Sequence, residues 1–480
     1  MQQALKNPNL IKREQANRSL SEFIKQAWHV LEPGDPYVHN WHIDAISEHL
    51  EAVTSGEITR LLINVPPGMM KSLATSVFFP AWEWGAKDLQ HYKYISASYS
   101  QSLATRDNIK TRRLISSEWY QRNWPIMLMP DQNQKTKFEN SKTGFREAMA
   151  ADSMTGARGH RVIVDDPHSV AGASSDQQRQ TTLDWFCHAL PTRLISSTKS
   201  AIIVIMQRLH QGDISGHILK KELDYVHLCL PMEFEPSRKC YTVLGFEDPR
   251  SKEGELLFPA RFPKDVVRRD KRTMGSLAVA GQFQQSPMPA GGNIFREEDF
   301  QWYTNYRQYS RVVISWDTAY KAQELNDPSV ATVWGVHDHG YDLLEVVGDR
   351  LTYPKLKKRA IRLAEKWVQQ KELYKGHILL TILIEDKASG QSLIQDLKES
   401  QFNIVAIMPD NDKVTRASTC SPKVEDGKVY LKTGASYVED YVEEMTVFPN
   451  GEHDDRVDST SQFLNWISSN VGSFTDHFLN

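Results

Sequence analysis

Short apolar runs alternate with helix-like stretches from the start of the chain to about residue 230. The runs are RLLINV (60–65), HYKYISAS (91–98), RVIVDDP (161–167) and AIIVIMQ (201–207). Their apolar positions are continuous rather than alternating with polar ones, as in strands that are buried on both faces of a parallel sheet. We therefore expect an α/β domain with a mainly parallel sheet in the first half of the chain.

The pattern changes between about residues 235 and 300, where Pro, Gly and charged residues are frequent. This stretch is interpreted as a linker or small subdomain with one helix around Val266–Gln285. Further strands are predicted at RVVISWDTA, SVATVWGVHD, YDLLEVVGDR and HILLTILIED, with helices at Pro354–Lys371 and Gln391–Glu399. The predicted domains are therefore 1–235, 236–295 and 296–480.

The composition is that of an ordinary globular protein, with 40% hydrophobic and 24% charged residues. The net charge of −3 means that contact with nucleic acid must come from local basic patches. The four cysteines include no C-x-x-C pair, which disfavours a zinc ribbon or a disulfide framework and is typical of a reducing cytosol. We see neither a membrane-spanning run of roughly 20 residues nor a signal-peptide core, and expect a soluble intracellular protein.

The segment NVPPGMMKS (64–72) lies between a predicted strand and a predicted helix. A phosphate-binding loop has this order, with a lysine for the phosphates and a hydroxyl for Mg²⁺. The usual G-x-x-x-x-G-K-[ST] pattern is not met, because Val65 and Met70 stand at its glycine positions and Gly68 is the only glycine of the loop. An ordinary strand–helix turn is therefore the alternative. The backbone N–H of Met70 can replace that of glycine provided that the loop needs no positive φ there.

The strand RVIVDDP ends in two carboxylates, which a nucleotide site requires. We assign Asp165 to Mg²⁺ and Asp166 to polarising the attacking water. A capping pair before Pro167 is the alternative, which becomes less favoured beside a Lys-Ser loop. A third strand ends near Arg208 and His210, which can sense the γ-phosphate or serve in helix capping.

A second set of acids lies in the second half of the chain. Asp317 closes RVVISWD, Glu385 closes HILLTILIE, and Asp454, Asp455 and Asp458 lie at the start of a predicted helix. Acids three or four positions apart on a helix share one face, and two-metal phosphodiester cleavage uses such a group of carboxylates. This layout is typical of an RNase H-like nuclease, although each acid alone is also common at a strand end or helix N-cap. Asp327 is a candidate outer ligand and His453 a candidate for orienting water or phosphate.

Taken together, the chain resembles the large terminase subunit of tailed bacteriophages, the motor that pumps DNA into the procapsid. The resemblance runs from about Phe23 to Trp466. It rests on NVPPGMMKS, ASYSQSLATR, TGARGHRVIVDDP, QRLHQGDISG, QFQQSPMPAGGNIF, ISWDTA, IEDKASGQSLIQDL and HDDRVD. The family joins an N-terminal P-loop ATPase of the ASCE type to a C-terminal RNase H-like nuclease through a small linker subdomain. The resemblance implies ATP and Mg²⁺ as cofactors, with Mn²⁺ able to substitute in the nuclease site.

The resemblance implies a role for each residue of the ATP site. Lys71 and Ser72 bind the phosphates and Mg²⁺, Asp165 completes the metal site, and Asp166 takes the catalytic position that is often a Glu. The expected ATP-binding residues are Pro67, Gly68, Met69, Met70, Lys71 and Ser72, with Trp41 and His42 as candidates for holding adenine. An amphipathic core helix is an equal alternative for Trp41 and His42.

The resemblance also places Arg208 and His210 in the family's coupling segment, which links hydrolysis to movement of DNA. Family motors are rings in which an arginine of one subunit enters the ATP site of the next. Arg106 and Arg158 are both candidates, and the sequence does not choose between them.

In the nuclease half, the resemblance selects Asp317, Glu385 and one or both of Asp454 and Asp455. Glu385 is favoured over its neighbour because it lies five residues before Gly390, as in the family. The expected catalytic residues are Lys71, Asp166, Asp317, Glu385 and Asp455. The expected metal ligands are Ser72, Asp165, Asp317, Glu385, Asp454, Asp455 and Asp458.

The partners that the resemblance implies are double-stranded DNA, the portal protein, the small terminase subunit and further copies of the chain. The family assembles as a pentamer on the procapsid in the bacterial cytoplasm, isolated subunits are often monomers, and no membrane partner is expected. DNA contact should be mostly to phosphates, through RRDKR (268–272) or KLKKRAIR (355–362), unless these are solvated helix faces. The predicted function is ATP-driven DNA packaging with metal-dependent cutting. The alternatives are a helicase-like ATPase with a non-cleaving C-terminal domain, a nuclease with an inactive loop, and a non-enzymatic scaffold.

Overall fold

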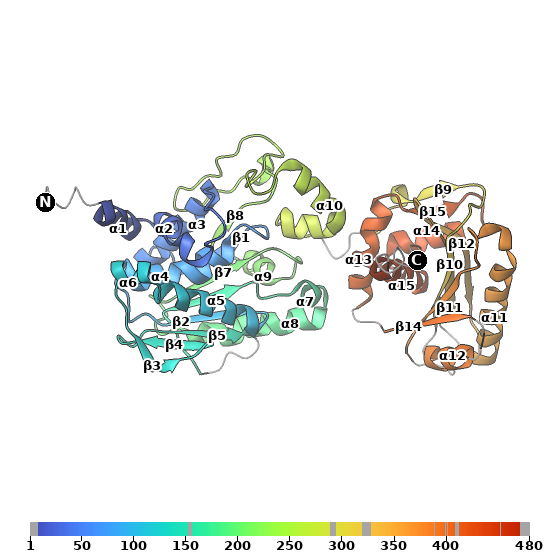
Figure 1. Cartoon of the computed structure of the whole chain (residues 1–480), viewed down its shortest axis with the longest axis horizontal. Coiled ribbons are helices and arrows are strands. Elements are labelled where there is room, and N and C mark those ends of the chain that lie inside the picture. Colours follow the sequence, from blue (N-terminus) through green and yellow to red (C-terminus); the bar gives the residue numbers. More distant parts are fainter. Residues whose placement is uncertain are drawn as a thin grey trace. The chain divides into compact units, whose positions relative to one another are not determined.

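The structure is a computed structural model, and it describes residues 8–151, 156–288, 294–318, 328–387, 389–398, 400, 402–408, 412–451 and 453–470. The chain divides into two compact units, each with its own sheet (Figure 1). The first unit comprises Met1–Asp270 and Ala278–Ala290, and the second comprises Lys271–Leu277 and Gly291–Asn480. The division of the chain into three domains with a linker at 236–295 stays a prediction.

In the described part of the first unit, eight strands form a sheet in the order β3-β4-β5-β2-β6-β7-β1-β8. The strands from β5 to β8 in this order are parallel, while β3 and β4 pair antiparallel. Their bounds are β1 Arg60–Asn64, β2 Tyr94–Ser98, β3 Leu128–Asn133, β4 Lys137–Asn140, β5 Phe145–Ala150, β6 Arg161–Asp165, β7 Ala201–Met206 and β8 Val226–Cys229. Every residue of β2, β6 and β7 is buried, which confirms the prediction drawn from their continuous apolar runs.

Helices pack on this sheet and on one another, except that the last helix of the set, α10, is divided between the two units (Figure 1). They are α1 Pro8–Arg18, α2 Leu20–Leu31, α3 Trp41–Ser55, α4 Phe79–Gly85, α5 Gln101–Ile115, α6 Glu118–Asn123, α7 Val170–Ser174, α8 Asp176–Asp184, α9 Ile214–Lys220 and α10 Lys264–Ala278, with π-helical turns at Leu73–Phe78, Trp185–Ala189 and Val279–Phe283. The predicted helix at 266–285 is therefore present, but it is interrupted at Gly275, whose φ is 76°. The ends of β1, β6 and β7 lie at one edge of the sheet because these strands are parallel neighbours.

In the second unit, seven strands of the described residues form a sheet in the order β14-β13-β10-β11-β12-β15-β9. Within this sheet, β11 pairs antiparallel with its neighbours β10 and β12, and the other described pairs are parallel. The bounds are β9 Gln301–Tyr303, β10 Arg311–Asp317, β11 Ser329–His337, β12 Gly340–Asp349, β13 Leu380–Glu385, β14 Asn403–Ile407 and β15 Val429–Lys432. The helices are α11 Tyr353–Gln369, α12 Ser389–Lys398, α13 Lys413–Glu425, α14 Val438–Val447 and α15 Asp455–Asn470. The predicted strands and the two predicted helices of this half are confirmed.

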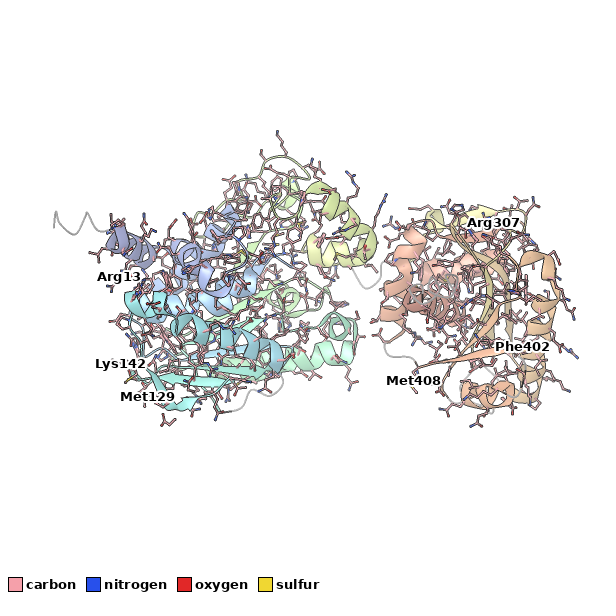
Figure 2. All side chains as sticks on the ribbon, viewed as in Figure 1. Arg13, Met129, Lys142, Arg307, Phe402 and Met408 are labelled. Carbon is pink, nitrogen blue, oxygen red and sulfur yellow. The ribbon has the colours of Figure 1, made fainter. Side chains whose placement is uncertain are left out.

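The second sheet has a core on each face. Figure 1 shows α11 on one side of it and α13, α14 and α15 on the other, and Figure 2 shows side chains filling the space between. Along β10, Val312, Ile314 and Trp316 belong to the core of the α11 side, whereas Val313 belongs to the core of the α15 side. Successive side chains of a strand point to opposite faces. Asp317 therefore lies on the same face as Val313, beneath α15.

Polar contacts fasten α15 to this face. Ser459 Oγ donates to the carbonyl of Ser315 at 2.7 Å, and Ser315 Oγ donates back to the carbonyl of Ser459 at 2.7 Å. Ser459 Oγ also accepts from the N–H of Thr332 at 3.1 Å. These fully buried bonds hold the start of α15, with its acids, at a fixed place along β10. No helix in the described ranges is long and apolar enough to cross a membrane.

Candidate functional sites

A cavity of about 830 Å³ lies at the edge of the first sheet where β1, β6 and β7 end. The segment after β1 and the carboxylates after β6 both line it, so the structure brings together residues that are distant in sequence. From the predicted ATP site, the lining includes Pro67, Gly68, Met70, Lys71, Ser72, Asp165 and Asp166. The geometry places the Lys-Ser pair and both acids around one space.

Ser72 and Asp165, the expected Mg²⁺ ligands, contact each other in this cavity. Ser72 Oγ donates to Asp165 Oδ1 at 3.0 Å, and Ser76 Oγ donates to Asp165 Oδ2 at 2.8 Å. Burial raises the pKa of Asp165 to about 7, and the charge of Asp166 adds to the rise. A buried carboxylate beside a hydroxyl and a second carboxylate fits Mg²⁺, because these are the oxygen ligands that this ion takes and its charge would offset the repulsion.

Lys71 pairs with the second carboxylate of the cavity. Its Nζ lies 3.1 Å from Asp166 Oδ2, and Asp166 Oδ1 accepts from the N–H of Gln207 at 3.1 Å. Asp166 has a φ of 42°, which turns the chain sharply at the end of β6. The ammonium of Lys71 and the catalytic carboxylate that the resemblance implies are therefore in direct contact.

The loop before Lys71 contains two residues in the left-handed region. Gly68 has a φ of 77° and Met70 a φ of 59°. Met70 can replace glycine without strain only if the loop needs no positive φ at this position. Because the φ of Met70 is positive, this condition is not met. A side chain in this region costs on the order of 1–2 kcal/mol, because Cβ approaches the carbonyl oxygen. A Cβ on Gly68 would in addition lie 2.7 Å from the ring of Phe262.

Trp41 and His42, the candidates for holding adenine, do not line the cavity. His42 is fully buried and its Nε2 hydrogen-bonds the carbonyl of Met69 at 3.2 Å, so it supports the loop from beneath. Burial lowers the pKa of His42 to about 4, which keeps the ring neutral. Trp41 instead stacks on Phe246. His42 is therefore placed as the core-helix alternative expects, whereas Trp41 is only half-buried. A role of either residue in holding adenine stays a prediction.

The apolar walls of the cavity come from residues that the sequence reasoning did not name, although Val38 lies in the segment 37–46 in which the adenine-binding residues were expected. They are provided by Trp28, Pro36, Val38, Phe258 and Ala260, together with the charged side chain of Arg261. Pro36 and Val38 directly precede α3, Trp28 lies in α2, and Phe258, Ala260 and Arg261 lie in the stretch rich in Pro, Gly and charge that is interpreted as a linker.

Arg106 and Arg158, the two candidates for the arginine that enters a neighbouring site, are placed differently. Arg106 lines the cavity of its own chain, and its Nε donates to Asp107 Oδ1 at 2.9 Å. This hydrogen bond raises the pKa of Arg106, and Asp165 and Asp166 act in the same direction. Arg158 is exposed ahead of β6 and is not among the residues lining the cavity.

The predicted coupling residues Arg208 and His210 lie in the turn that leads into α9. Arg208 Nε lies 3.0 Å from both carboxylate oxygens of Asp213, which caps α9 by accepting from the N–H of Gly216. A residue that the sequence reasoning missed joins this turn to the cavity. His168 lines the cavity, and its Nε2 accepts from the N–H of Ile214, the first residue of α9, at 3.2 Å.

The nuclease candidates meet at the ends of β10 and β13 and the start of α15. Burial raises the pKa of Asp317 well above its usual range, and Asp458, Asp455 and Glu385 each raise it further. Burial also raises the pKa of Asp455 to about 6, with Glu444 and Asp454 adding to the rise. The structure therefore places the predicted acids close enough for their charges to interact. Asp327 lies outside the described residues.

Basic side chains that the sequence reasoning missed are interleaved with these acids. Lys413 Nζ lies 2.6 Å from Asp454 Oδ1 and 2.9 Å from Asp458 Oδ2. Arg416 Nη2 lies 2.6 Å from Asp458 Oδ1, so both oxygens of Asp458 are bound by cations of α13. Asp458 is buried, and its ion pairs join α13 to α15. Its expected role as a metal ligand stays a prediction.

The remaining acids have the donor chemistry of a divalent-metal site. Asp317, Glu385 and Asp455 offer carboxylate oxygens, which suit Mg²⁺ or Mn²⁺, and their mutual repulsion is the kind that a bound cation relieves. Within the described part of the chain, no three His, Cys, Asp or Glu side chains are arranged so that they could hold a metal ion. Lys413 and Arg416 lie among the acids instead.

Comparison with known proteins agrees with this architecture. The family model of the terminase RNaseH-like domain matches residues 314–466, the part of the chain that contains all five nuclease acids. No curated protein sequence matches the chain.

Solved structures with a similar fold include the large terminase from a thermophilic bacteriophage. It is 12% identical, over 92% of this chain and 98% of that chain, with a TM-score of 0.51. The HK97 bacteriophage large terminase is 12% identical over 94% of this chain and 99% of that chain, with a TM-score of 0.37. The large terminase nuclease from thermophilic phage G20c with bound magnesium is 16% identical over 37% of this chain and 98% of that chain, with a TM-score of 0.28. The predicted α/β fold with an RNase H-like second domain is confirmed.

Proposed function

We propose that this chain, which has the fold of a terminase large subunit, uses ATP hydrolysis to move double-stranded DNA into a procapsid and cuts that DNA with a metal-dependent nuclease. The observation that carries the proposal is the presence of two separate acid-bearing sites. One unit has a Lys-Ser loop and two carboxylates around one cavity, and the other has acids at the strand ends of a terminase RNaseH-like domain. A non-enzymatic scaffold protein would need neither of these two sites.

In the ATP site, Lys71 exchanges its carboxylate partner for phosphate oxygens when nucleotide binds. Asp166 is thereby released from the ammonium and accepts a hydrogen bond from the attacking water, which it orients toward the γ-phosphate. Ser72 and Asp165 would hold Mg²⁺, which supplies positive charge to the phosphate oxygens. The left-handed backbone at Gly68 and Met70 directs N–H groups of the loop toward the phosphates.

The base and the remaining phosphate charge are held by the walls of the cavity. Adenine packs against the apolar side chains of Pro36, Val38 and Phe258, while Arg261 and Arg106 face the phosphates from the same chain. Arg158, exposed and outside the cavity, is then the candidate that reaches a neighbouring subunit. His42 supports the loop rather than contacting adenine.

In the nuclease site, Asp317, Glu385 and Asp455 would supply carboxylate oxygens to a divalent ion, which would activate water and stabilise the charge of the cleaved phosphodiester. As the described residues stand, these acids are not arranged to hold that ion, so binding it requires their side chains to move. Asp454 shares its charge with Lys413, and Asp458 keeps α13 and α15 together. Portal protein, small terminase subunit and further copies of the chain are the partners that this function requires, in the host cytoplasm and on the procapsid.

The test uses one variant for each site. Lys71→Ala is expected to reduce DNA-stimulated ATP hydrolysis at least a hundredfold and to leave Mn²⁺-dependent plasmid cutting intact. Asp317→Asn is expected to abolish cutting and to leave hydrolysis intact. Hydrolysis that survives the loss of Lys71 would contradict the phosphate-loop assignment. A wild-type protein that hydrolyses ATP but cuts no plasmid would support the alternative, a helicase-like ATPase whose second domain only binds DNA.

A further inference from the structure

A short chain of hydrogen bonds joins the start of α3 to the loop that precedes Lys71. Asn40 Nδ2 donates to the carbonyl of Leu257 at 2.9 Å and also contacts His42 Nδ1. His42 Nε2 lies 3.2 Å from the carbonyl of Met69 in the loop. Because Leu257 directly precedes the cavity wall, two side chains of one helix start connect that wall to the loop.

The direction of each hydrogen bond in this chain follows from its two ends. A carbonyl oxygen can only accept, so the amide nitrogen of Asn40 donates to Leu257. The same nitrogen donates its second proton to His42 Nδ1, which is therefore the unprotonated ring atom. The proton of the neutral ring lies on Nε2, which donates it to the carbonyl of Met69. Burial lowers the pKa of His42 to about 4, which keeps the ring neutral.

Asn40 makes these contacts in place of the usual role of its position. It is the N-cap of α3, where an asparagine side chain normally accepts from an N–H of the first helical turn. Among the described residues its side chain makes no such cap bond, and its amide serves His42 and Leu257 instead. The helix start is therefore built around the ring of His42.

The carbonyl of Met69 sets the direction of the N–H that follows it. In a trans peptide the C=O and the next N–H point in opposite directions. The carbonyl of Met69 is directed at His42, which is fully buried and does not line the cavity. The N–H of Met70 is therefore directed away from His42, on the side of the cavity that Met70 lines.

This orientation of the peptide is also the one that strains Met70. Rotating the peptide plane between Met69 and Met70 by half a turn would change the φ of Met70 from 59° to a negative value, which methionine adopts freely. The rotation would also turn the N–H of Met70 away from the cavity. His42 opposes it, because the carbonyl of Met69 would lose its donor in the core. Glycine at position 70 would have no strain to relieve.

We infer that His42 is a positioning residue, which holds the N–H of Met70 toward the phosphates of the nucleotide and so compensates for the glycine that the loop lacks. The inference rests on the proposed ATP site, and it goes beyond that site in coupling two residues. His42 is required when residue 70 is methionine, and much less when residue 70 is glycine.

Binding of N-methylanthraniloyl-ADP with Mg²⁺ to the full chain tests this coupling. His42→Asn, whose shorter side chain does not reach Met69, is expected to weaken binding about tenfold, because strain then favours the rotated peptide. In Met70→Gly the same substitution should weaken binding less than about threefold. His42→Gln carries an amide nitrogen in place of Nε2 and should stay within about threefold of wild type. Equal weakening by His42→Asn in both backgrounds, or none in either, would overturn the inference.

Urea unfolding without nucleotide separates this inference from the proposed ATP site. Met70→Gly is expected to raise the urea midpoint of wild type but not that of His42→Asn, in which the rotated peptide has already relieved the strain. An equal rise in both would show that His42 does not hold the loop. If the midpoints are coupled in this way but wild type binds no ADP analogue, the ATP site is rejected and the hold of His42 on the loop stands.

A second buried histidine of α3 provides the matched control. His49 bonds the carbonyl of Ala45 at 2.7 Å and the hydroxyl of Thr242 at 2.9 Å. In His49→Asn, Met70→Gly should raise the midpoint as it does in wild type. If His42→Asn does not fold, ¹⁵N spectra of histidine-labelled wild type decide, with the His42 signals identified by their loss in His42→Gln. A proton on Nε2 alone is expected, and a ring protonated on Nδ1 would overturn the inference.

Discussion

Met70 holds the left-handed position directly before the lysine of the loop, where a glycine would be free of strain. Met70→Gly is expected to raise the free energy of unfolding of the first unit by about 0.5–1 kcal/mol. The strain relieved is about 1–2 kcal/mol, and the greater freedom of glycine in the unfolded chain offsets about half of it. Urea unfolding followed by tryptophan fluorescence measures the change.

The neighbouring methionine provides the matched control. Met69 is fully buried, so Met69→Gly is expected to lower the same free energy by more than about 2 kcal/mol through loss of core packing. ATP hydrolysis should persist in Met70→Gly. If Met70→Gly hydrolysed ATP and the wild type did not, the proposal of a working loop with methionine would have to be withdrawn.

Asp165 gives the first unit a defined pH dependence in the absence of metal. Burial raises its pKa from 3.8 to about 7 in the folded chain, so the folded state binds a proton that the unfolded state releases. The stabilising effect of this proton is complete below about pH 4 and is lost as the pH rises to about 7. We expect the stability of wild type in EDTA to fall between pH 5 and pH 8, and to fall less in Asp165→Asn.

Thermal unfolding of both proteins at the two pH values measures this difference. Wild type is compared with Asp165→Asn because Asp317 and Asp455 also have raised pKa values. These two acids add the same pH dependence of stability to both proteins. Added Mg²⁺ with ADP should remove most of the fall in wild type. An equal fall in Asp165→Asn would show that its carboxylate does not titrate in this range.

At the scale of elements, the alternation of side chains along β10 decides which helix Asp317 faces. Asp317 shares its face with Ser315, and Ser315 is bonded to Ser459 of α15. Ser459→Ala is expected to lower the free energy of unfolding of the second unit by about 1–3 kcal/mol, because the N–H of Thr332 loses a buried partner. Plasmid cutting should fall as well, since the start of α15 positions Asp455.

A serine near the other end of α15 is the control for this substitution. Ser469 is exposed and donates only to a carbonyl of its own helix in the described structure. Ser469→Ala should leave both stability and cutting unchanged. A loss of stability in Ser459→Ala without any loss of cutting would mean that the helix register does not control the metal site.

The strands that carry the sites were predictable because each is a continuous apolar run followed directly by an acid, as in β6 and β10. The placement of Lys413 was not predictable in the same way. It belongs to a largely polar helix that contains Pro422, and it lies 41 residues from Asp454 in the sequence. Local patterns indicate that an acid ends a strand, but the cation that it meets depends on how distant helices pack across the sheet.

Trp41 and His42, the residues predicted to hold adenine, show the same limit of sequence-based prediction in the first unit. His42 lies at a position where a ring could face either the core or the ligand, and helical periodicity does not distinguish the two. The structure buries it beneath Met69. The cavity wall includes Val38 and Phe258, which are more than 200 residues apart, so no local pattern could have joined them.

At the scale of the whole molecule, two units with separate cores predict two unfolding transitions. A buried ion pair in the first unit offers a way to assign them. Arg161 of β6 and Glu83 of α4 lie 2.8 Å apart with both side chains fully or almost fully buried, and Glu83 also accepts from the hydroxyls of Tyr94 and Thr54. Removal of one partner leaves a buried charge unpaired.

Glu83→Ala is therefore expected to lower the stability of the first unit by about 3–5 kcal/mol and to leave the second unit unchanged. Calorimetry should show one transition shifted to lower temperature and the other at its original temperature. The unshifted transition is identified by the loss of Mn²⁺-dependent cutting on heating, while ATP hydrolysis is lost with the shifted one. Equal shifts of both transitions would contradict the division into two units, because a defect confined to β6 and α4 can reach the second unit only if the two cores unfold as one.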